Sequence, residues 1–371
     1  MRRATAFAPA LLAAFAACGL ALAQAGTPTR APAQREASPP ASSDHSREVS
    51  RSALREQALQ MLTEAALSTE PLIRANALEA LQAAPNRAEN IFRAGLQDEN
   101  PGVRFVAAYS VGQLKLRSSA TFIEPLLSDP DPRVRAAAIF ALTALKKTVD
   151  PSPLATMLDD ADPLVRGEAA RILGELKNPS AIPMLKAATA RADRRNATVY
   201  GASDERVYQA ERVFQLQVAE ALVKLGDQQS VHALRAALYP ATREGFESAA
   251  LAAVMLGNLN DQKASSQLVD LIEQRVPGSP ESKDPRQAQY VQPREVRLAA
   301  AGALARMGFP DGLYVAEMYA GDEDPAVRAQ AAYVQGEAGK KASLPALEEA
   351  MRDPSPLVRV AAAAAVLKAT K

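Results

Sequence analysis

One stretch decides how this chain folds: it runs from Asp129 to Leu142 and reads DPDPRVRAAAIFAL. The Asp131 carboxylate can accept hydrogen bonds from the free N–H groups of a first helical turn. Pro132 suits the next position because it has no N–H to leave unpaired. The stretch therefore predicts the start of a helix. It returns as DADPLVR at residues 160–166, with close copies that end at Arg104, Arg328 and Arg359 and a looser copy that ends at Arg74.

These copies divide the chain from residue 51 onward into about nine units of two helices. The reference position of each second helix is Arg74, Arg104, Arg135, Arg166, Gln215, Ala249, Arg297, Arg328 and Arg359. Successive steps are 30, 31, 31, 49, 34, 48, 31 and 31 residues, which suits a repeat of one helix pair. The first helices lie between these positions, for example at 53–67 and 344–351. We therefore expect an all-α fold, a right-handed α-solenoid whose stacked units bury a shared core.

The repeated pattern resembles the HEAT repeat. It reads Asp-x-(Asp/Asn)-Pro-x-Val-Arg-x-x-Ala-Ala-x-x-Leu, and the fourth unit continues with GEL at 174–176 and AIPML at 181–185. The short period is similar to the HEAT-like subgroup named for phycobilisome lyase subunits, and the resemblance covers residues 50–371. It implies the fold more specifically than the function, because the family includes scaffolds, lyase subunits and a diiron hydroxylase.

An aspartate recurs six positions before the reference arginine. One interpretation is a row of metal or acid–base groups, but a catalytic site needs its residues once, whereas this pair recurs in nearly every regular unit. In HEAT-like solenoids such residues form a ladder between adjacent units, and we favour that role. The ladder residues are Asp98, Arg104, Asp129, Arg135, Asp160, Arg166, Asp322, Arg328, Asp353 and Arg359.

Two long steps in the repeat place inserts near 190–208 and 276–293, each between the paired helices. Both must emerge from the same edge of the solenoid, with bases ~20 Å apart at ~10 Å per helix layer. Two interpretations of the inserts are open: each is a binding loop, or each is a surface insertion without a function. Tyrosine and arginine are enriched where interfaces concentrate their energy. The binding candidates on the inserts are Arg194, Arg195, Tyr200, Tyr208, Arg286 and Tyr290.

A second candidate surface lies on the second helices. In each second helix, the position five residues after the reference arginine lies about opposite the apolar side that packs into the core. We therefore expect this position on the concave face of the solenoid. Aromatic side chains there either line a groove for a partner or pack between neighbouring units. The candidates on this face are Phe105, Tyr109, Phe140, Arg171 and Tyr333.

The composition argues against a nucleic-acid partner. Lys and Arg total 43 and Asp and Glu 42, without the net basic charge that nucleic-acid binding usually requires. Aromatic residues are 5% of the chain, and hydrophobic residues, many of them alanine, are 48%, which favours helices.

The N-terminus reads as an export signal. Residues 1–25 combine Arg2 and Arg3, an apolar run and a small-x-small site ending at Ala25, so we expect cleavage there and a periplasmic or secreted protein. Cys18 is the only cysteine and lies in a weak lipoprotein-like context, so lipidation there is the alternative and would supply the only membrane attachment. Residues 26–49 are rich in Pro, Ser and Ala, and we expect a disordered linker.

No catalytic motif stands out. The two histidines are His45, in the expected linker, and His232, in an expected helix. The paired His-Glu motifs of the diiron branch are absent from the sequence, and so are phosphate-binding loops and nucleophile elbows. We expect no metal and no cofactor.

These observations favour a monomeric, non-catalytic scaffold in the bacterial cell envelope that binds a protein or peptide through its concave face or its inserts. The first alternative is an accessory or chaperone-like subunit of an enzyme complex. The second is an enzyme acting on a polymer through insert carboxylates such as Asp204 and Glu205.

Overall fold

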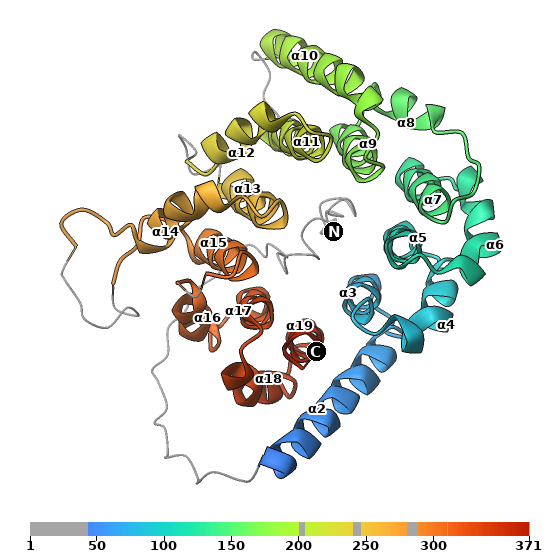
Figure 1. Ribbon diagram of the computed structural model, residues 1–371. Helices are drawn as coiled ribbons and strands as arrows, with labels where there is room; N and C mark the ends of the chain where they lie inside the picture. Colours follow the sequence, from blue (N-terminus) through green and yellow to red (C-terminus); the bar gives the residue numbers. More distant parts are fainter. Residues whose placement is uncertain (1–43, 200–204, 240–245, 280–287, 310, 371) are drawn as a thin grey trace, which may run out of the picture.

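The computed structural model describes residues 44–199, 205–239, 246–279, 288–309 and 311–370; for 44–49, 193–199 and 205–206 it describes the backbone only. The described chain consists of nine helix pairs arranged in a ring, with the second helix of each pair on the inside (Figure 1). The prediction of an all-α solenoid of about nine pairs is confirmed.

The two layers of the ring alternate along the chain. The outer helices are α2 (Asp44–Ala65), α4 (Pro85–Gly95), α6 (Ala120–Ile123), α8 (Ser152–Met157), α10 (Ile182–Val199), α12 (Val231–Ala237), α14 (Ser265–Glu273), α16 (Leu313–Tyr319) and α18 (Leu344–Ala350). The inner helices are α3 (Pro71–Leu81), α5 (Pro101–Leu114), α7 (Pro132–Ala144), α9 (Pro163–Glu175), α11 (Glu205–Lys224), α13 (Phe246–Asn258), α15 (Arg294–Arg306), α17 (Pro325–Ala338) and α19 (Pro356–Ala369).

The inner helices begin where the repeated turn predicts. The side chain of Asp131 accepts a hydrogen bond of 2.9 Å from the N–H of Arg133, and Pro132 opens α7. Asn100, Asp162 and Asp324 cap α5, α9 and α17 in the same way. A cap of this kind contributes ~1 kcal/mol to the stability of the helix that it begins. The turn therefore separates the outer helix from the inner one and fixes where the inner helix starts.

In three places the ladder joins one unit to the next through a bidentate arginine–aspartate pair. Arg104 donates from Nε and Nη2 to the carboxylate of Asp129 at 2.7 and 2.9 Å, and its Nη1 donates to two carbonyl oxygens of its own turn. Arg74 binds Asp98 and Arg328 binds Asp353 with the same geometry. The arginine of one unit thus holds the turn of the following unit.

The expected ladder is interrupted elsewhere. Arg135 does not bind Asp160; its recorded bonds go to the carbonyl oxygens of Asp129 and Pro130. Arg359 likewise binds carbonyl oxygens of its own turn, since it lies in the last unit. The partner of Asp322 is Arg294, at 2.8 Å.

Arg166 and Arg297, which lie next to the two inserts, have partners other than a ladder aspartate. Arg166 pairs with Glu211 of α11 and lies over the ring of Phe214. Arg297 is fully buried, donates to Tyr319 Oη at 2.7 Å and lies 3.3 Å from the ring centre of Tyr290. Glu211 thus takes the place of the ladder aspartate for Arg166, whereas the aspartate expected for Arg297, Asp322, binds Arg294.

Four glycines bring neighbouring inner helices unusually close. A Cβ added at Gly112, Gly174 or Gly257 would lie 2.8 Å from the Cα of an alanine on the next inner helix, and one added at Gly336 would lie 2.6 Å from Ala365 Cα. Each glycine stands eight positions after its reference residue. Close approach on the inner side shortens the inner circumference and therefore curves the solenoid.

This curvature brings the two ends of the solenoid together. Helix α19 packs on both α2 and α3, and the last and first units share one hydrophobic cluster that includes Leu62 and Val366. Arg55 of α2 donates to the carbonyl oxygen of Leu367 at 2.9 Å and to Thr370 Oγ1 at 3.2 Å. The ring is therefore closed, a feature that the sequence did not predict.

Several sequence expectations fall outside the described residues: the signal segment 1–25 with Cys18, the linker over 26–43, Tyr200, Asp204 and Arg286. Residues 44–49 of the expected linker belong to α2, and the insert near 190–208 lengthens α10 and α11 on either side of 200–204. Among the helices that the structure describes, none has the length and apolar character needed to span a membrane.

Candidate functional site

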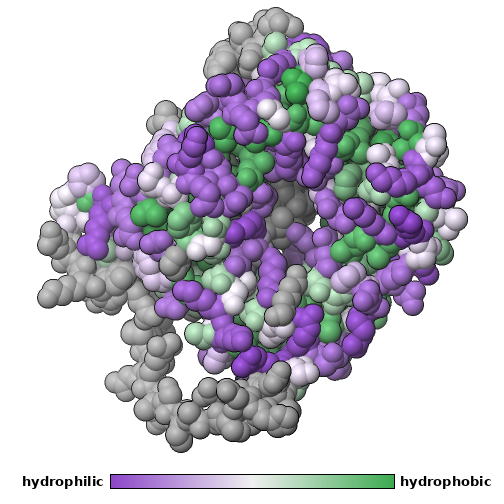
Figure 2. Space-filling model, viewed as in Figure 1, coloured by the Kyte–Doolittle hydropathy of each residue, from purple (hydrophilic) through white to green (hydrophobic). Residues whose placement is uncertain are grey.

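The inner helices surround a cavity at the centre of the ring, and the space-filling view shows the hollow bordered largely by hydrophilic residues (Figure 2). The cavity has a volume of about 390 Å³ and is lined by α3, α5, α17 and α19. A second cavity of about 170 Å³ shares Glu79 and Gln82 with it and extends to α9, α11 and α13. Ring closure thus converts the concave face of an open solenoid into an interior.

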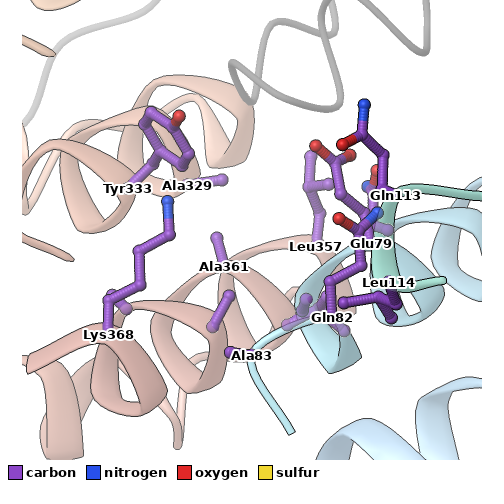
Figure 3. A pocket seen from close by; sticks show the side chains of 15 residues that line it. Glu79, Gln82, Ala83, Gln113, Leu114, Ala329, Tyr333, Leu357, Ala361 and Lys368 are labelled. Carbon is purple, nitrogen blue, oxygen red and sulfur yellow. The ribbon is translucent and has the colours of Figure 1, made fainter. Parts of the chain in front are cut away.

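Two sets of polar side chains face each other across the larger cavity (Figure 3). Glu79 and Gln113 come from α3 and α5, whereas Tyr333 and Lys368 come from α17 and α19. Small apolar residues such as Ala361 lie between them. Segments distant in sequence therefore meet here only because the ring closes.

The cations on the Tyr333 side are compensated by one carboxylate. Arg306 Nη2 lies 2.8 Å from Glu337 Oε1, and the ammonium of Lys368 binds the same oxygen. Lys368 Nζ also lies 4.6 Å from the ring centre of Tyr333. Burial alone would raise the pKa of Glu337, but Lys368 and Arg306 lower this pKa to about 2. Glu337 is therefore ionised at neutral pH.

A second ion-paired group borders the smaller cavity. Arg171 Nη2 lies 2.5 Å from Glu168 Oε1, and Lys224 Nζ lies 2.8 Å from Glu175 and 2.9 Å from Glu220. Burial opposes the charge of Lys224, but the two glutamates hold its pKa above its usual range. These cations are also compensated by neighbouring carboxylates.

Glu79 differs from the other carboxylates of the ring interior. Burial raises its pKa to about 7, against the opposing effect of Lys368, Arg306 and Arg171. Within the described part of the chain, no hydrogen bond or ion pair to its carboxylate is recorded. Glu79 is thus an ionisable group near neutrality with no protein partner, which is typical of functional sites.

Replacing Glu79 by glutamine is expected to stabilise the protein at pH 8 and to change little at pH 4. A glutamate whose folded pKa is about 7 and whose unfolded pKa is about 4.3 binds its proton more tightly when folded, so stability falls as pH rises through this window. Because the side chain is partly exposed, we expect a gain of about 1–2 kcal/mol in the free energy of unfolding at pH 8. Urea unfolding at both pH values measures this gain in the free energy of unfolding. An equal effect at pH 4 and pH 8 would contradict the raised pKa of Glu79.

The aromatic residues expected on the concave face mostly pack between units. Phe105 and Phe140 are buried, which favours packing between units over an exposed groove, although Phe105 also borders the smaller cavity. Tyr109 lies between them, with ring centres 6.2 Å from Phe105 and 4.9 Å from Phe140, and Arg171 lies over Tyr109 at 4.3 Å. Stacking of this kind tightens the contact between α5, α7 and α9. Tyr109, Arg171 and Tyr333 still border the ring interior.

The insert candidates divide into two groups. Tyr208 is exposed at the start of α11, whereas Tyr290 is partly buried over Arg297 and has a structural contact. An isolated antiparallel bridge between Arg275 and Tyr290 orders the base of the second insert. The side chains of Arg194 and Arg195 lie outside the described residues.

Most exposed large hydrophobic side chains of the described chain occur at one place in the helix pair, the turn from the outer to the inner helix. With the exception of Phe122, the large exposed hydrophobic residues of the described chain lie in or beside the turns that join outer to inner helices. Five of them belong to three consecutive units and form what we call the hydrophobic rim: Val207, Tyr208, Tyr239, Val276 and Val291. Tyr208 could be found from the sequence because it lies in the first insert, whereas Tyr239 could not, because it lies outside both inserts and its turn carries no repeat signature.

The described residues hold no arrangement suited to metal chemistry. No group of three or more His, Cys, Asp or Glu side chains in this part of the chain could hold a metal ion. His232 is exposed on α12.

Together, the nine pairs, the ladder and the glycine contacts define a closed helical-repeat protein with a central cavity. Its sequence matches the family model of HEAT repeats over residues 59–143, 119–202 and 288–368, and that of the PBS lyase HEAT-like repeat over 214–239. The HEAT-repeat matches span more than half of the chain, so the protein belongs to the HEAT-repeat family. A search of curated proteins finds no significant match.

Solved structures share the helical-repeat architecture at low identity. Human deoxyhypusine hydroxylase in complex with glycerol is 19% identical over 86% of this chain and 98% of that chain, with a TM-score of 0.36. The complex of CpcE and CpcF of phycocyanin lyase from Nostoc sp. PCC7120 is 20% identical over 73% and 91%, with a TM-score of 0.34. The karyopherin Kap121p bound to the SUMO protease Ulp1p is 14% identical over 87% and 43%, with a TM-score of 0.32. These similarities concern the fold alone.

Proposed function

We propose that this protein is a non-catalytic scaffold that binds a protein partner through its hydrophobic rim. The observation that carries the proposal is the gathering of exposed Val207, Tyr208, Tyr239, Val276 and Val291 on one edge of three consecutive units. Exposed apolar residues that cluster, rather than scatter singly, are characteristic of interaction surfaces. Tyrosine is also among the residues that contribute most to binding energy at interfaces.

The rim is favoured over the inner face because the ring is closed. An open solenoid can wrap a folded partner in its concave surface, but here α19 packs on α2 and α3. A cavity of about 390 Å³ has the size of a small-molecule site. A folded partner must therefore bind outside it, and the stacked helices present a prearranged surface with little ordering cost.

Replacing Tyr208, Tyr239 and Val276 together by serine tests this proposal. Because a tyrosine that anchors an interface typically contributes ~2 kcal/mol or more, we expect the triple variant to bind an affinity-captured partner at least ~10-fold more weakly. Binding is measured by calorimetry with the purified partner. The matched control is Phe122→Ser, which removes an equally exposed aromatic residue away from the rim. Equal affinity of the triple variant and the wild type would contradict the proposal.

We further propose that the protein acts in the bacterial cell envelope as a monomer, after removal of residues 1–25. This rests on the basic start, the apolar run and the small-x-small site of the sequence. Mass spectrometry of the protein from its host is expected to find Gly26 as the first residue. A lipid-modified Cys18 at the N-terminus would instead indicate the membrane-anchored alternative, and an intact Met1 would exclude export by this signal.

A further inference from the structure

Glu79 places a carboxylate in the central cavity beside apolar walls. The neighbouring cations Arg171, Arg306 and Lys368 each bind another carboxylate, namely that of Glu168 or Glu337. No bond to Glu79 is recorded within the described residues, although it lines both cavities. An isolated carboxylate in such a place is costly unless a cation accompanies it.

Two polar groups beside Glu79 present hydrogen-bond acceptors, whereas the cation of the same cavity, Lys368, lies on its other side and binds Glu337 (Figure 3). Gln113 donates its amide N–H groups to Tyr109 Oη at 2.6 Å and to Glu175 at 3.3 Å, which leaves its carbonyl oxygen as an acceptor. The side-chain oxygen of Asn76, one turn before Glu79 on α3, is buried and has no partner in the described chain. This wall therefore suits a ligand that donates hydrogen bonds and carries a positive charge.

The remaining lining decides between a metal ion and an organic cation. Glu79 is not part of any carboxylate or histidine cluster of the described chain that could hold a metal. The floor of the cavity is apolar and includes Leu357, Val360 and Ala361 of α19, and Ala361 lies between the two sets of polar side chains. Its volume of about 390 Å³ far exceeds that of a bare ammonium ion. The cavity thus offers room and apolar contacts for a hydrocarbon body.

We propose that the central cavity binds a small organic cation, an alkylammonium or alkylguanidinium group, with its charge at Glu79 and its hydrocarbon part on the floor formed by Leu357, Val360 and Ala361. The group belongs either to a free amine or to a basic side chain of a peptide. This site is distinct from the hydrophobic rim and does not depend on the function proposed for it.

Calorimetric titration of the full chain at pH 8 tests the proposal. The probes are n-butylamine, a short alanine peptide with one lysine, and two comparison compounds of similar shape, n-butanol and butyrate. We expect saturable binding of the amine or of the peptide, at least ~10-fold tighter than binding of either comparison compound. The probe that binds identifies a free amine or a peptide side chain as the source of the cation.

Three variants locate the binding. Glu79→Gln is expected to weaken binding at least ~10-fold, and Ala361→Phe is expected to weaken it by filling the floor. Glu64→Gln, an exposed glutamate of α2, is the matched control and is expected to leave binding unchanged. Thermal unfolding followed by circular dichroism checks that each variant folds. Failure of both cationic probes to bind, or equal binding by Glu79→Gln and the wild type, overturns the proposal.

Discussion

Replacing Glu211 by alanine is expected to lower the free energy of unfolding by about 3–5 kcal/mol, because it leaves Arg166 charged, buried and without a carboxylate. Arg166 is 1% exposed and Glu211 is 6% exposed. The other recorded bonds of this guanidinium go to the carbonyl oxygens of Asp160 and Ala161, at 2.7 and 3.0 Å. Neutral carbonyl oxygens hydrogen-bond a cation but do not cancel its charge.

Urea unfolding followed by circular dichroism measures this effect. The double variant Arg166→Met with Glu211→Leu removes both charges and is expected to be close to the wild type, since apolar replacements of a buried pair are often neutral. Glu348→Ala breaks the exposed pair with Arg352 and should cost less than ~1 kcal/mol. A Glu211→Ala variant no less stable than Glu348→Ala would show that the buried pair does not hold the fourth and fifth units together.

Replacing Gly336 by valine is expected to cost about 2–4 kcal/mol by forcing α17 away from α19. An added Cβ would lie 2.6 Å from both Cα and Cβ of Ala365, and backbone cannot yield as a flexible side chain can. The two helices meet next to the seam where the ring closes, so the loss of packing should also loosen α19 from α2 and α3.

Gly302→Ala is the matched control for this prediction. It lies in the same kind of inner helix, but its added Cβ would meet only Val334 Cγ2, at 3.4 Å, an ordinary contact. Alanine has a higher helix propensity than glycine, so this variant is expected to gain up to ~1 kcal/mol. Both variants are compared by thermal unfolding. Equal midpoints for the two would mean that the close helix approach does not contribute to stability.

The repeat could be read from the sequence because each unit repeats the same local chemistry. A capping Asp or Asn, a proline at the first helical position and an arginine that returns to the turn act within a few residues of one another. The stripe of small residues then predicts which side of each helix is buried. These local rules place the inner helices that have the turn signature, whereas α11 and α13, whose turns have lost it, are placed by the apolar pattern of the helix itself.

The closed ring could not be read because it depends on small displacements that add up over nine units. Gly112, Gly174, Gly257 and Gly336 each look like a tolerated small residue in isolation. Their joint effect on curvature appears only when the helices are stacked. For the same reason the sequence did not predict that Glu79 of the first unit and Lys368 of the last unit line the same cavity. The central cavity itself was not predicted either.

Closure of the ring creates the central cavity and is the reason for placing the proposed partner site on the hydrophobic rim. Spin labels at Gln57 of α2 and at Thr370, in a chain with Cys18 replaced by serine, test closure directly through their distance distribution. Thr370 Oγ1 lies 3.2 Å from Arg55, so we predict a single narrow distribution at short distance. A broad distribution at long distance would show an open solenoid in solution and would contradict the account.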